Sequence, residues 1–142
     1  TDNTKIYDKV ADLIASLDLQ ERVYITGYVK EDERMNALIR ECDVCVYPYD
    51  KFYYSNVSSA ALNNALANYM PTVAYPTASF TELNKIDQTM VLTENFAYYE
   101  LARELKRLNI AQSAQKSQKY ALKHSYDLLS QGLIETYKSV VR

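Results

Sequence analysis

The chain has 142 residues, of which 48% are hydrophobic and 24% are charged, a composition typical of one folded domain rather than of a disordered chain. The formal net charge is -2 and the 16 Lys and Arg residues form no basic block, which argues against nucleic-acid binding. No apolar run reaches the roughly 20 residues of a transmembrane helix, and the N-terminal residues lack the pattern of a signal peptide. We therefore expect a cytoplasmic protein, and because the sequence begins at Thr1 we expect it to be part of a longer chain.

Helical and strand-like patterns alternate along the first half of the chain. Apolar residues at helical spacing predict helices, and short apolar runs bounded by turn residues predict strands. In chain order we expect a helix over 6–17, a strand over 22–26, a helix over 32–41, a strand over 43–47 and a helix from about Asn56 to Met70.

The second half begins with two more strands and ends in helices. Strands are expected over 72–75 and 89–92, separated by a loop that contains residues 80–83, and the helices that follow are interrupted near residues 124–126. Short strands separated by helices favour a parallel sheet with helices on both faces. The sequence thus predicts a single α/β domain over residues 1–142, without repeats or a linker.

Cys42 and Cys45 have the spacing of half a zinc or redox site. The sequence holds no second cysteine pair, and His124 is its only histidine. We therefore predict that both thiols are buried structural residues on different elements and that the chain binds no metal.

Small polar residues crowd the start of the helix expected near Asn56. They are Ser55, Asn56, Ser58 and Ser59. In a parallel sheet, ligands collect at the carboxyl ends of the strands, where the free N–H groups of a helix start favour an anion such as a phosphate. Ser and Asn are also the preferred N-cap residues for local reasons, so phosphate binding and simple capping are both open.

Four segments, in this order, resemble the C-terminal, nucleotide-sugar-binding domain of family 4 glycosyltransferases, which have the two-domain GT-B fold. The match as a whole covers nearly the whole chain, and the segments that carry it are residues 23–29 (VYITGYV), 35–48 (MNALIRECDVCVYP), 58–74 (SSAALNNALANYMPTVA) and 81–83 (TEL). The resemblance implies a Rossmann-like domain that takes part in sugar transfer from a nucleotide diphosphate donor to an acceptor, with retention and without a metal. No cofactor other than the donor substrate is implied.

The resemblance also implies roles for individual residues. It places the diphosphate at the helix start, against Ser58, Ser59 and the backbone at Val57. It assigns the donor sugar to Asn56, the ribose to Asn64 and the nucleobase to the loop of Tyr28. Lys51, in the loop after the second strand, is the nearest candidate for phosphate charge, although loop lysines are commonly just solvated. Catalytic residues remain unassigned.

Two departures from the family pattern affect the site. The family carries a pair of glutamates at the positions of Asn56 and Asn64. Asparagine hydrogen-bonds a hydroxyl but cannot stabilise developing positive charge, and Asn64 could equally be a solvated or packed helix residue. The glycine that usually precedes the Pro-Val strand is replaced by Met70 or Tyr69.

A third departure concerns missing elements. Related domains begin with two further strands, which lie between the strands expected here at 22–26 and 43–47, and with a basic Arg and Lys pair that contacts the donor phosphates. We therefore expect an N-terminal acceptor-binding domain or a second polypeptide to complete the sheet and the cleft. The missing part would provide any peripheral membrane contact, and the chain alone would not turn over donor.

Two functions are therefore open. One is the donor-binding domain of a glycosyltransferase. The alternative is a glycosyltransferase-like interaction or stabilising module that kept the fold and lost the chemistry, which the asparagine pair would permit.

Overall fold

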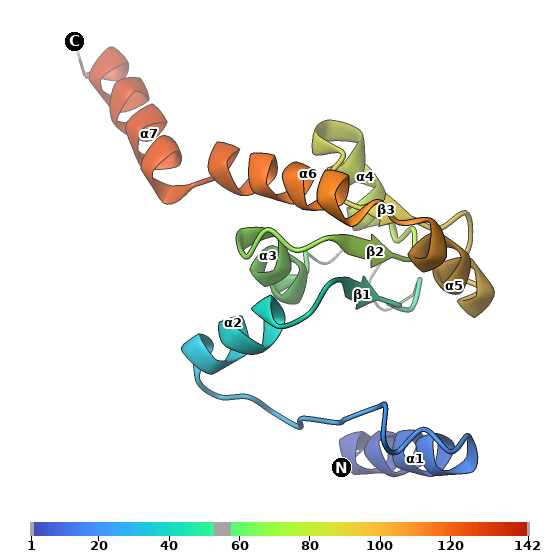
Figure 1. Cartoon of the computed structure of the whole chain (residues 1–142). Coiled ribbons are helices and arrows are strands. Elements are labelled where there is room, and N and C mark those ends of the chain that lie inside the picture. The colour runs from blue at the N-terminus through green and yellow to red at the C-terminus, as the bar shows by residue number, and fades with distance from the viewer. Residues whose placement is uncertain (1, 53–57, 142) are drawn as a thin grey trace. The chain divides into compact units, whose positions relative to one another are not determined.

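The structure is a computed structural model that describes residues 2–52 and 58–141. The chain divides into two units, Thr1–Asp32 and Glu33–Arg142, and each is described by itself. Figure 1 labels the helices and strands.

The first unit consists of helix α1 (Asp2–Ser16) and an extended segment. The helix ends where Asp18 adopts a left-handed conformation with φ of 53°. This lets the Leu19 amide donate to the Ile14 carbonyl at 3.0 Å, which satisfies one of the last free carbonyls of the helix.

The predicted strand over residues 22–26 is wrong. Residues 23–30 have no regular secondary structure and belong to no strand of the described sheet. A β-strand is held by hydrogen bonds to a neighbouring strand, and no described segment pairs with these residues. The described sheet consequently has three strands rather than four.

The second unit contains a parallel sheet in the order β1-β2-β3 (Figure 1). Its strands are β1 (Cys45–Tyr47), β2 (Thr72–Ala74) and β3 (Val91–Leu92). In the register, Val46 pairs with Val73, and Val73 pairs with Val91. The three later strand predictions and the parallel α/β class are confirmed, with shorter strands than expected.

Helices precede, connect and follow these strands. They are α2 (Asp32–Arg40), α3 (Ala60–Ala67), α4 (Ala78–Asp87), α5 (Tyr98–Arg107), α6 (Ile110–Lys123) and α7 (Tyr126–Val140). The predicted interruption near 124–126 is confirmed: Ser125 caps α7 by accepting a hydrogen bond from the Leu128 amide.

The loop predicted over residues 80–83 is wrong, because these residues lie within α4. Thr77 caps this helix by accepting a hydrogen bond from the Phe80 amide. Phe80 is buried and Leu83, one turn later, packs against the same core, so the apolar side of α4 faces inward.

One hydrophobic core joins the sheet to three helices. Its fully buried members come from α3, β2, α4 and the approach to β3: Leu62, Leu66, Ala74, Phe80 and Met90. Tyr120 of α6 packs against them, and so do Tyr47 and Tyr49, whose rings lie 5.6 Å apart. Burial of each large side chain contributes about 1.5–3 kcal/mol, so this cluster holds α3, α4 and α6 against the sheet.

Candidate functional site

The segment after β1 leads to the N-terminus of α3, which begins at Ala60. The predicted helix start near Asn56 is wrong, because Ser59 has an extended backbone (φ -103°, ψ 112°) and is the N-cap residue. Asn56 and Val57 lie outside the described residues. Ser58 precedes the cap in a non-helical conformation.

The Ser59 hydroxyl is committed to the fold. It accepts a hydrogen bond from the Leu62 amide at 3.1 Å and lies 3.0 Å from the Tyr49 hydroxyl, and the residue is 8% exposed. For this side chain, the geometry is that of an N-cap. The Asn63 amide donates to the Ser59 carbonyl. Among the described residues, the Ala60 and Ala61 amides are therefore the donors of the first turn that remain available to a ligand.

A cavity of about 270 Å³ lies at this helix start. Ser58, Ser59, Asn63 and Ser79 give it polar groups, and the remaining walls are apolar and aromatic: Leu62, Phe80, Leu83 and Tyr120. Both α3 and α4 begin after a parallel strand, so their N-terminal residues meet at the carboxyl edge of the sheet. This arrangement suits an anionic ligand with an attached carbon skeleton.

Asn64 lines a different cavity, of about 570 Å³, together with Tyr69, Tyr126 and Leu129. Asn63 lines both cavities. The structure therefore places Asn63, rather than Asn64, beside Ser58 and Ser59. Sequence reasoning did not single out Asn63, because it placed the family's glutamate positions at Asn56 and Asn64 by counting back from Pro71; counted from the Ser59 cap, residue 63 lies one turn further along the same face.

Comparison with known proteins identifies the family of this fold. A family model described as glycosyl transferases group 1 matches residues 3–109, which is most of the chain. The chain belongs to the group 1 glycosyl transferases. No curated protein and no solved structure gives a significant match.

Two further predicted site residues of this glycosyl transferase domain lie in loops. Tyr28 is 91% exposed and belongs to the first unit. Lys51 is exposed, with its ammonium group 4.9 Å from the centre of the Phe52 ring.

Tyr69 is one of the two residues considered for the position of the family's usual glycine. Its φ of 61° is left-handed, a conformation that favours glycine. The turn closes α3 because the Met70 amide donates to the Ala65 carbonyl at 3.0 Å, and Met70 itself is buried. Of Tyr69 and Met70, Tyr69 is the one with the backbone conformation that favours glycine.

The prediction that both cysteine thiols are buried is wrong for Cys42. Cys42 is exposed, and only Cys45 is half-buried, in β1. Burial, and then the neighbouring Cys42, raise the pKa of the Cys45 thiol, so it stays protonated at neutral pH. Among the described residues there is no group of three His, Cys, Asp or Glu side chains that could hold a metal ion.

Tyr47 supports the site from the adjacent strand. Its hydroxyl donates to the Ala61 carbonyl at 2.7 Å, and burial is the main cause that raises its pKa. A protonated Tyr47 therefore ties β1 to the first turn of α3.

Within the described residues, no helix is long and apolar enough to cross a membrane.

Proposed function

We propose that the chain is the C-terminal, donor-binding domain of a family 4 glycosyltransferase with the GT-B fold. Such an enzyme transfers a sugar from a nucleotide diphosphate to an acceptor with retention. The observation that supports this most is the N-terminus of α3, which opens into a cavity with polar and apolar walls at the carboxyl edge of the sheet in a group 1 glycosyl transferase.

The diphosphate would bind the Ala60 and Ala61 amides and the exposed Ser58 hydroxyl. Amide donors and the positive end of the helix dipole favour a dianionic group at this place without a metal. Ser59 would act by holding the first turn in shape rather than by direct contact, because its hydroxyl already has two partners.

The other parts of the donor would be distributed around this turn. Asn63 lies on the cavity wall and would meet the ribose or the donor sugar. The roles suggested by the resemblance remain part of the proposal: Asn56 for the sugar, Asn64 for the ribose, Tyr28 for the base and Lys51 for phosphate charge. The acceptor and the catalytic groups would come from an N-terminal domain or a second polypeptide.

A second candidate is a module that kept the fold and lost the chemistry. Two observations favour it. Asparagines stand where the family carries glutamates, at Asn56 and Asn64, and the buried Ser59 hydroxyl already has a structural role. Such a module would have no measurable affinity for a nucleoside diphosphate.

Calorimetric titration with uridine, guanosine and adenosine diphosphates separates the two. Ser59→Asp puts a carboxylate beside the phosphates, whereas Ser59→Asn is a matched neutral control, and both residues are good N-caps. The donor-site proposal predicts binding that weakens at least about tenfold in the Asp variant relative to the Asn variant, which is about 1.4 kcal/mol. Equal affinities of the two variants would contradict it, and no binding by the unmodified chain would favour the silent module.

A further inference from the structure

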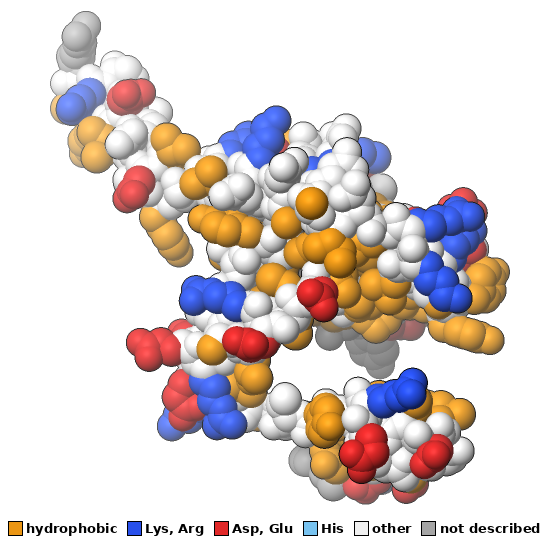
Figure 2. Space-filling model, viewed as in Figure 1, with side chains coloured by type: hydrophobic (Ala, Val, Ile, Leu, Met, Phe, Trp, Pro, Cys, Tyr) orange, Lys and Arg blue, Asp and Glu red, His pale blue; other side chains and the backbone are white. Residues whose placement is uncertain are grey.

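A cluster of lysines occupies one face of α6, away from the start of α3. Lys116, Lys119 and Lys123 follow one another at spacings of three and four residues, so they share one side of the helix. Figure 2 shows basic side chains gathered over α6 in a chain whose formal net charge is -2. Like charges at this spacing oppose one another, and an anion between them would relieve the repulsion.

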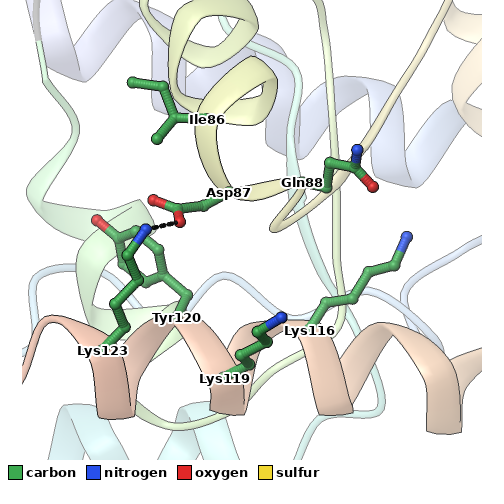
Figure 3. A pocket seen from close by; sticks show the side chains of 7 residues that line it. All are labelled: Ile86, Asp87, Gln88, Lys116, Lys119, Tyr120 and Lys123. Carbon is green, nitrogen blue, oxygen red and sulfur yellow. Dashed lines mark hydrogen bonds and ion pairs between the residues drawn. The ribbon is translucent and has the colours of Figure 1, made fainter.

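These lysines line a cavity of about 530 Å³ between α6 and the end of α4. Ile86, Asp87, Gln88 and Tyr120 complete the wall. Figure 3 shows Lys116 and Lys119 extending from α6 into the space beneath Gln88. The volume is in the range of sites for small organic ligands.

The only carboxylate in this wall already has partners. Asp87 accepts a hydrogen bond from the Lys123 ammonium at 2.5 Å, its second oxygen lies 3.1 Å from the His124 ring, and its side chain is 9% exposed. Within the described part of the chain, no carboxylate lies within ion-pairing distance of Lys116 or Lys119. Two positive charges therefore face the cavity without compensation.

Polar groups continue on both sides of Lys116. This residue also lines a cavity of about 400 Å³ with Asn84 and Lys85, and another of about 180 Å³ with Glu104, Arg107 and Ser113. The Ser113 hydroxyl is buried and has no hydrogen-bond partner among the described residues. Lys116 thus lies beside three cavities, and the wall of one of them carries the unused Ser113 donor.

The groups around the main cavity act mostly as hydrogen-bond donors. Two ammonium groups line it, and so does the Gln88 amide, which can accept as well as donate and whose oxygen is the atom nearer Lys116 in Figure 3. Burial, and then the nearby Asp87 carboxylate, raise the pKa of Tyr120, so its phenol keeps its proton. Such a set matches a ligand with several acceptor oxygens and two negative charges, while Ile86 and the Tyr120 ring offer contact to attached carbon atoms.

We propose that this cavity binds a phosphate-bearing ligand through Lys116 and Lys119. Except for Tyr120, its lining residues are different from those of the cavity at the α3 N-terminus, so it is a second anion site. The phosphate could belong to a free metabolite or to the headgroup of an anionic phospholipid.

The test compares two double variants of equal charge in a Ser59→Asp background, which places a like charge at the proposed donor site. Lys116→Gln with Lys119→Gln removes the two ammonium groups from the cavity. Lys106→Gln with Lys138→Gln removes the same charge from α5 and α7, outside the cavity. The probes are inorganic diphosphate, followed by calorimetry, and vesicles of phosphatidic acid against phosphatidylcholine, followed by sedimentation.

We expect the cavity variant to bind diphosphate or phosphatidic acid vesicles at least tenfold more weakly than the α5 and α7 variant. Binding of diphosphate alone would identify a free phosphate compound as the ligand, and binding of phosphatidic acid vesicles would identify a lipid headgroup. Equal affinity of the two double variants, or no binding of either probe, would overturn the proposal.

Discussion

At the scale of single residues, Tyr69 carries a conformational cost at the end of α3. A left-handed backbone costs a residue with a Cβ about 1–2 kcal/mol, and Tyr69 adopts it with φ of 61°. The free energy of unfolding of Tyr69→Gly, measured by denaturant titration, should therefore exceed that of Tyr69→Ala by about 1 kcal/mol, although glycine is the more flexible residue in the unfolded chain. Both variants lose the same ring, so their difference isolates the backbone. An alanine variant as stable as the glycine variant would show that φ at this position relaxes freely.

Asn63 and Asn64 provide a test of which asparagine belongs to the site. Asn63 lines the cavity with Ser58 and Ser59, whereas Asn64 lines the cavity with Tyr69 and Tyr126. Loss of one hydrogen bond should cost about 0.5–1.5 kcal/mol. We expect Asn63→Ala to weaken nucleoside diphosphate binding more than Asn64→Ala in calorimetry, with diphosphate itself little affected by either. The reverse order would contradict a ribose contact at Asn63 and support the one proposed for Asn64.

The position of the α3 N-cap could not be predicted from the sequence alone. Ser55, Asn56, Ser58 and Ser59 are all residue types that cap helices, so their chemistry predicts a helix start without choosing among them. The choice falls on Ser59 through tertiary contacts, namely the Tyr49 hydroxyl and the burial of Leu62. The side chain that lines the cavity beside Ser58 and Ser59 is that of Asn63, which the spacing of the residue types did not single out.

At the scale of elements, Asp87 links the end of α4 to the end of α6. The hydrogen bond from Lys123 is the main cause that lowers the pKa of Asp87. Because the folded-state pKa is below the unfolded value of about 3.9, this link stabilises the fold above that pH and is lost as the pH falls through the folded-state value.

The free energy of unfolding of the Asp87→Asn variant should therefore depend less on pH than that of the parent. We expect it to be less stable than the parent by about 0.2–1 kcal/mol at pH 7, with the difference shrinking as the pH falls below about 4. Denaturant unfolding between pH 3 and 7 measures this, with Glu82→Gln as a control for an exposed pair on the same helix. A difference that stays constant with pH would mean that Asp87 acts through packing alone.

The strands show why some elements could be predicted and others could not. Residues 72–74 are buried on both faces in the centre of the sheet, so their short apolar run is sufficient for the prediction. Residues 22–26 have a similar apolar pattern, yet a strand also requires a partner, and a local pattern carries no information about one. Helix α4 was missed because its first residues, after Pro76 and Thr77, look like a turn until the Thr77 cap is seen.

At the scale of the whole molecule, the alternation of helices and strands predicted the parallel α/β class, and the order β1-β2-β3 confirms it. The crossover helices make this prediction possible, since parallel neighbours need a long connection between them. The alternation of helices and strands does not predict that apolar side chains of α7 are exposed. They include Leu133 and Tyr137, each 71% exposed, and Val140 at 76%.

The central claim is that the first turn of α3 binds the diphosphate of a nucleotide donor. The most direct measurement is the amide spectrum of the ¹⁵N-labelled protein during titration with a nucleoside diphosphate, with the matching nucleoside as control. The proposal predicts that the largest, saturable shifts fall on Ser58, Ala60 and Ala61 and are absent with the nucleoside. Shifts at these amides no larger than those along α7, for example at Leu133, would contradict it.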